Sequence, residues 1–162
     1  MTELYPYEPP DGIGALITWL SGIGNVSPSI GNITEDNVGP DRIPGGPLPY
    51  LMVGRPVVRD DRITQFGVYT VHAFAKGTSP RQALTNAYNL AMLAHRRVQA
   101  MGPPFAAQQS ITLPGGVVVQ CDGVDTKEGP TWVQYSETDK SIQQFVTEYD
   151  IPWRYIASPP LT

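Results

Sequence analysis

Hydrophobic residues recur at helical spacing over residues 79–101, which are predicted to form one long helix. Ser79 and Gln82 have the spacing of a capping box at its start, and Gly102 followed by two prolines ends it. The residues that define its predicted buried face, at spacings of four and three, are Pro80, Leu84, Ala87, Ala91, Ala94, Val98 and Met101. Because much of this face is alanine, the helix is expected to pack closely against a sheet.

A shorter helix is predicted after Asp11, a suitable N-cap, because apolar residues up to Leu20 also follow the helical period. The next segment, residues 22–49, is rich in glycine and proline and has no sustained period. It is predicted to be an extended irregular arm. Such a segment is either a connector or, as its isolated apolar residues favour, an arm that orders against a partner. Residues 157–162 are expected to form a flexible C-terminal tail.

Five further segments have the composition and spacing of β-strands. They are residues 50–53, 65–76, 117–124, 131–135 and 142–151. Gly54 and Pro56 are expected to end the first strand, residues 114–116 to form the turn before the third, and residues 125–130 to form a polar loop. The alternate residues predicted to share one face at the end of the chain are Phe145, Thr147, Tyr149, Ile151, Trp153 and Tyr155.

The order of these elements is helix, arm, two strands, long helix and three strands. Runs of consecutive strands with a single crossover helix favour an α+β fold over a doubly wound parallel sheet. Residues 1–162 are therefore predicted to form one domain. Its mainly antiparallel sheet of four to five strands is packed by the long helix and the short N-terminal helix. The length agrees, because 162 residues of which 41% are hydrophobic supply one core.

The composition excludes several classes of protein. The single cysteine, Cys121, rules out an internal disulfide and a cysteine-cluster zinc site. The longest apolar runs are far shorter than the ~20 residues that cross a bilayer. The N-terminus has acids and prolines where a signal peptide has basic and then apolar residues. We therefore expect a soluble protein made in the cytoplasm, without a membrane partner.

The charge is mildly acidic overall but unevenly distributed. Eleven Lys and Arg against fifteen Asp and Glu give a net charge of −4, which argues against a dedicated nucleic-acid surface. Residues 76–101 contain four bases and no acid, namely Lys76, Arg81, Arg96 and Arg97. A basic helix between acidic flanks can bind an acidic partner, although a solvated helix face is the more ordinary explanation.

The chain contains few residues that could form a catalytic set. Its two histidines are His72, on a predicted strand, and His95, on the long helix. Cys121 lies in a β-run, where a buried and inert cysteine is the usual occupant. Asp122 and Asp125 lack the ligand spacing of a calcium loop, and the glycines form no phosphate-binding loop. We expect no metal, no cofactor and no catalytic site, and a small enzyme that uses Cys121 or His72 remains the alternative.

Aromatic residues gather in the last predicted strands. Aromatic side chains are common anchors of protein–protein interfaces, but they also fill the space that an alanine-faced helix leaves in a core. The candidates for a subunit contact are Tyr50, Trp132, Tyr135, Phe145, Tyr149, Trp153 and Tyr155. The sequence therefore predicts residues for a subunit interface and no set of catalytic residues.

From residue 11 to 156 the chain resembles the tail terminator proteins, which cap the tail tube of siphovirus-type long-tailed bacteriophages. The matching features are the run at residues 48–53 after an irregular arm, residues 61–63 before the long strand at 65–75, the long helix at 79–101, a glycine-containing strand pair with Trp132, and the closing run at 145–155. Related neck and tail-completion proteins share this order of elements.

The resemblance implies a structural virion protein at the head-proximal end of the tail. Such a subunit is expected to form a homo-oligomeric ring, a hexamer, with no catalytic residues. The ring stops polymerisation of the tail-tube protein and offers the tail side of the interface with the head–tail connector protein. DNA passes through its lumen without specific binding. The alternatives are another neck or connector protein and a tail-completion protein.

Overall fold

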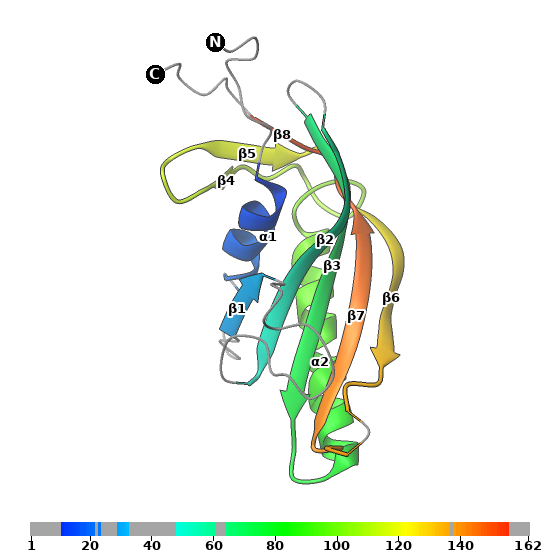
Figure 1. Cartoon of the computed structure of the whole chain (residues 1–162). Helices are drawn as coiled ribbons and strands as arrows, with labels where there is room; N and C mark the ends of the chain where they lie inside the picture. The colour runs from blue at the N-terminus through cyan, green and yellow to red at the C-terminus, as the bar shows by residue number, and fades with distance from the viewer. Residues whose placement is uncertain are drawn as a thin grey trace, which may run out of the picture.

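The computed structural model describes residues 11–21, 23, 29–32, 48–60, 64–136 and 138–155 (Figure 1). Most of the predicted arm at 22–49 and all of the tail at 157–162 lie outside these residues. The elements in chain order are α1 (Gly12–Leu20), β1 (Ser29–Asn32), β2 (Tyr50–Asp60), β3 (Thr64–Lys76), α2 (Pro80–Gln99), β4 (Ile111–Thr112), β5 (Val118–Cys121), β6 (Asp125–Val133), β7 (Ile142–Asp150) and β8 (Trp153–Tyr155). The fold is α+β, as predicted.

The larger sheet has the strand order β2-β3-β7-β6, and every pair in it is antiparallel. β1 adds to the outer side of β2 in parallel. β4, β5 and β8 form a smaller antiparallel sheet. The two sheets are joined where the first residues of β3, Thr64 and Gln65, pair with Arg154 and Trp153 of β8. β3 thus contacts three other strands and is the centre of the molecule.

Helix α2 forms as its sequence predicts. Ser79 is the N-cap, and its side chain accepts a hydrogen bond from the Gln82 backbone N–H at 3.1 Å. Pro80 occupies the first turn, where it interrupts no helical hydrogen bond. In a full capping box the Gln82 side chain would accept a hydrogen bond from the backbone N–H of Ser79. Here the Gln82 Oε1 atom accepts hydrogen bonds from the backbone N–H and the hydroxyl of Thr78 instead.

The buried face of α2 is rotated from the predicted one. Leu84, predicted to be in the core, is 40% exposed, whereas Ala83 and Leu90 are buried. The buried residues of the helix are Ala83, Ala87, Leu90, Ala91, Ala94 and Val98. Four alanines keep this face narrow, so α2 lies close behind the sheet (Figure 1). Aromatic side chains of the strands fill the space between them.

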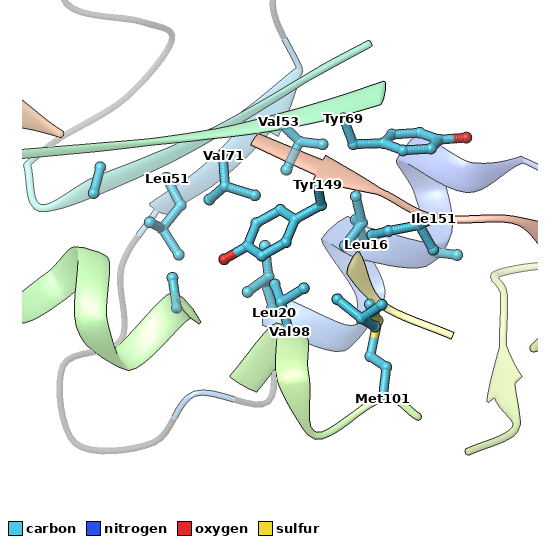
Figure 2. Packing of buried hydrophobic residues seen from close by; sticks show 14 of the residues in the cluster. Leu16, Leu20, Leu51, Val53, Tyr69, Val71, Val98, Met101, Tyr149 and Ile151 are labelled. Atoms are coloured by element: carbon cyan, nitrogen blue, oxygen red, sulfur yellow. The ribbon is translucent and has the colours of Figure 1, made fainter. Parts of the chain in front are cut away.

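The main core lies between the larger sheet and the two helices. Figure 2 shows Tyr149 of β7 surrounded by Leu16 and Leu20 of α1 and by Val98 of α2. Trp153 has no exposed surface and is the largest fully buried side chain among the described residues. A second, smaller cluster lies apart from this core and contains Tyr50, Met52, Phe74, Tyr135 and Ile142, with Leu48 packed against it.

Helix α1 begins at the predicted N-cap, where the Asp11 carboxylate accepts a hydrogen bond from the Gly14 backbone N–H at 2.9 Å. It is fixed to the end of α2 by Trp19 and Arg97. The Arg97 Nε–H donates to the Trp19 carbonyl oxygen at 2.9 Å, the Trp19 indole N–H donates to the Arg97 carbonyl oxygen, and the guanidinium stacks over the indole ring. Arg97 is therefore held inside the subunit.

Several predicted strand boundaries are wrong. β2 continues through Gly54 and Pro56 to Asp60, because a register shift between Gly54 and Val57 places the proline where the ladder is already interrupted. The predicted polar loop at 125–130 belongs to β6. β1, β4 and β8 are short strands that the sequence analysis did not separate, and β1 lies within the predicted arm. The turn at Gly115 and Gly116 is confirmed, since both have positive φ.

Replacing Trp153 with alanine is expected to lower the free energy of unfolding by about 3–5 kcal/mol, because it leaves a large cavity in the core. Urea denaturation of the monomer measures this loss. Trp132→Ala is the control, since Trp132 is 49% exposed and its removal creates no enclosed cavity. Equal losses for the two variants would contradict the structural role assigned to Trp153.

Candidate subunit-interface site

Five of the seven aromatic residues predicted as interface candidates are buried in their own chain. Phe145, Tyr149 and Trp153 belong to the main core, and Tyr50 and Tyr135 belong to the second cluster. A buried side chain offers no surface to a neighbouring subunit, so the packing of the monomer accounts for these five. The side chain of Tyr155 is outside the described residues. Trp132 is the remaining exposed candidate.

Trp132 lies at the edge of the larger sheet, beside helix α2. Its register partner on β7 is Phe145, and the Tyr88 ring of α2 packs edge-on against Phe145 with centroids 5.5 Å apart. The Trp132 indole N–H donates to the Gln143 side-chain oxygen at 2.8 Å, which fixes the ring. Trp132 and Tyr88 thus flank Phe145, and both remain about half exposed.

The solvent side of α2 has an apolar middle with an arginine at each end. These residues follow spacings of three and four, so they form one line along the helix, here called the outer stripe. The outer stripe consists of Arg81, Leu84, Tyr88, Met92 and Arg96. Leu84 and Tyr88 are 40% and 46% exposed, and both arginines are exposed. The sequence analysis missed it because it placed Leu84 in the core.

Among the described residues, the opposite face of the larger sheet carries four carboxylates, here called the acidic face. Asp125 of β6 pairs with Asp150 of β7, and Glu128 pairs with Glu148. Since Tyr149 and its alternate neighbours point toward α2, Glu148 and Asp150 point away from it. No helix of the described residues covers this side (Figure 1).

The acidic face opposes like charges across a strand pair, which destabilises a sheet. Glu148 and Asp150 are half-buried, whereas Asp125 and Glu128 are exposed. Further along the same face lie Val146, which is half-buried, and Val133, which is 39% exposed. The face therefore combines an acidic end with an apolar one. The sequence analysis missed it because residues 125–130 were predicted to be a loop.

His72 lies on the helix-free side of β3, next to the second cluster. Its ring is stacked near Phe74, and its nitrogens contact the Gln144 side-chain amide at 2.9 Å and the Thr70 hydroxyl at 3.1 Å. Burial lowers the pKa of the His72 imidazole to about 4. These partners suit a neutral histidine that completes the packing between two strands.

Cys121 belongs to the main core and has no exposed surface. Burial raises the pKa of its thiol to about 11, so the nucleophilic thiolate is disfavoured at neutral pH. His72 lies on the other side of the sheet. The structure therefore does not bring together Cys121 and His72, the two residues of which the alternative enzyme would use one or the other.

A shallow cleft of about 760 Å³ opens beyond the C-terminal end of α2. Its apolar wall includes Phe105, which is 65% exposed, and its polar wall includes His95. Asp125 and Asp150, at the end of the acidic face, also line this cleft. The His95 ring is held by the Tyr149 hydroxyl at 2.8 Å, and burial and the nearby Arg96 lower its pKa. Among the described residues, no group of three or more His, Cys, Asp or Glu side chains is placed to hold a metal ion.

Comparisons with known proteins identify no family. No protein-family model matches the chain, and no curated protein matches it significantly. Neither helix in the described part of the chain combines the length and apolarity needed to span a bilayer. The structural part of a functional proposal therefore comes from the outer stripe and the acidic face.

The stability of the fold is expected to fall as the pH falls from 6.5 toward 4. The unfolded chain binds a proton at His72 near pH 6.5, whereas the folded chain binds it only near pH 4, so protonation favours unfolding in this window. Urea denaturation is expected to show a loss of about 2 kcal/mol between pH 7 and pH 5 from this residue. The contribution of His72 is the difference between wild type and His72→Gln in how the free energy of unfolding changes from pH 7 to pH 5. Identical pH profiles of the two proteins would contradict it.

Replacing Glu148 with lysine is expected to stabilise the monomer by about 0.2–1 kcal/mol, because it turns a repulsive cross-strand pair with Glu128 into an attractive one. Thermal unfolding at low and high salt measures the effect, which shrinks as salt screens the charges. Glu148→Gln removes the repulsion without adding attraction, so its stability is expected to lie between those of the wild type and Glu148→Lys. A destabilised lysine variant would show that the two carboxylates do not repel each other.

Proposed function

We propose that the chain is a structural virion protein that caps the tail tube of a long-tailed bacteriophage. In this proposal its subunits form a six-fold ring at the head-proximal end of the tail. The ring stops polymerisation of the tail-tube protein and forms the tail side of the joint with the head–tail connector protein. DNA passes through the lumen without specific binding, and the protein performs no catalysis.

The observation that carries the proposal is the exposed apolar surface formed by Leu84, Tyr88 and Trp132. Contiguous exposed apolar side chains on a folded chain commonly mark an interaction surface. This surface lies on the helix side of the sheet, whereas the acidic face lies on the other side. Two different surfaces are what a ring requires, because each subunit must contact its two neighbours through unlike faces.

The resemblance of the sequence to tail terminators supports the particular ring that we propose. The α+β fold, with one long helix between the second and third long strands of the larger sheet, agrees with that resemblance. The fold alone does not define a function, since one architecture hosts many activities. The assignment to the tail therefore rests on the resemblance of the sequence.

Native mass spectrometry of the purified full-length protein is expected to detect a hexamer, either alone or after mixing with tail-tube subunits. In the same mixture, tube polymerisation followed by light scattering is expected to stop when the protein is added. A chain that remains monomeric under both conditions would contradict the proposal. Electron microscopy of labelled particles distinguishes a tail terminator from another neck protein by the position of the label.

A further inference from the structure

We propose that neighbouring subunits associate by docking the outer stripe of one copy onto the acidic face of the next. The inference rests on the proposed function, since it names the contact that would build the ring. The occupant of each surface is a second copy of this chain. Side-chain charge and exposed apolar area carry the argument, and no backbone pairing between copies is needed.

The outer stripe has the charge and apolarity of a docking surface. Leu84 and Tyr88 expose apolar area in its middle, and Arg81 and Arg96 lie at its two ends. Helix α2 contains no acidic residue, so neither arginine has a carboxylate partner on its own helix. Arg97, by contrast, is already held by Trp19. The two arginines on the outer stripe are thus directed toward solvent.

The acidic face has the complementary properties. Its two like-charged pairs, Asp125 with Asp150 and Glu128 with Glu148, are unfavourable in an isolated subunit. An arginine brought by a neighbouring copy would relieve this repulsion, since opposite charges across an interface favour association and set its register. Val133 and Val146 continue the face with apolar area that suits the middle of the outer stripe.

Among the described strands, β6 pairs only with β7, and its other edge is poorly suited to pair with a strand from another copy. Its register is shifted between Thr126 and Glu128 and again between Glu128 and Thr131. Gly129 has φ +101°, and a Cβ atom there would lie 2.5 Å from the Val146 carbonyl oxygen, so only glycine fits. Pro130 then lacks an N–H donor. Such features protect an edge from strand addition, and association through faces is favoured instead.

The two surfaces lie on opposite sides of the sheet, so this contact is head-to-tail. Helix α2, which carries the outer stripe, lies behind the sheet (Figure 1), and the acidic face is on the side of the sheet away from α2. A heterologous contact of this kind repeats from copy to copy and closes into a ring when the rotation between copies permits. The same contact therefore explains why one chain needs both surfaces.

Paired charge reversals test the contact in the full-length protein. The helix variant carries Arg81→Glu and Arg96→Glu, and the sheet variant carries Glu128→Lys and Glu148→Lys. Each variant alone brings like charges together and is expected to weaken self-association about a hundredfold by analytical ultracentrifugation. Mixed in equal amounts, the two variants can alternate around an even-numbered ring with complementary charges at every contact. The mixture is expected to restore assembly, as is a single chain that carries all four changes.

A matched control separates this contact from a general effect of net charge. Lys76→Glu with Lys140→Glu changes the net charge as much as the helix variant does, at exposed positions far along the sheet from the acidic pairs. It is expected to assemble like the wild type, and circular dichroism confirms that each variant is folded.

The possible outcomes distinguish the two proposals. If the wild type assembles and either reversed variant assembles equally well, the contact is wrong and the proposed function stands. If both variants fail to assemble and their mixture does not recover, the pairing of these two surfaces is also overturned. A wild type that never assembles, alone or with tube subunits, overturns the proposed function itself.

Discussion

The close approach of helix α2 to the larger sheet is the constraint on which the rest of the structure depends. It requires the four alanines of the helix face, because a larger side chain at any of them would push the helix outward. The space beside these alanines is then filled from the sheet by Phe145 and Tyr149. Aromatic residues that could have served an interface are thereby used in the core, and the helix presents its remaining apolar residues to solvent.

Local signals predicted the elements that depend on few neighbours. The cap at Ser79 and the periodic alanines define α2 without reference to the rest of the chain, and Asp11 does the same for α1. The extension of β2 beyond Pro56 could not be predicted, because the bulge that accommodates the proline exists only in the pairing with β3. The short strands depend in the same way on partners distant in sequence.

The candidate site was harder to predict than the fold, for a physical reason. The alternate residues from 145 to 153 were predicted to share one face. This pattern does not determine whether α2 or a neighbouring copy covers that face. The acidic pairs depend on the register between β6 and β7, and a one-residue shift would place different residues opposite each other. The exposure of Leu84 likewise depends on how the helix is rotated about its axis on the sheet. The cover of β7, the β6–β7 register and the rotation of α2 are all set by contacts between elements that are distant in the sequence.

The parallel pairing of β1 with β2 constrains the length of the chain between them. Two neighbouring strands that run in the same direction cannot be joined by a tight turn, because the chain must first travel back to the end from which it started. In the sequence, residues 33–49 separate the two strands. Shortening this segment to a few residues would force β1 either to reverse its direction or to leave the sheet. The length of this glycine- and proline-rich segment thus has a topological minimum, independent of anything that it binds.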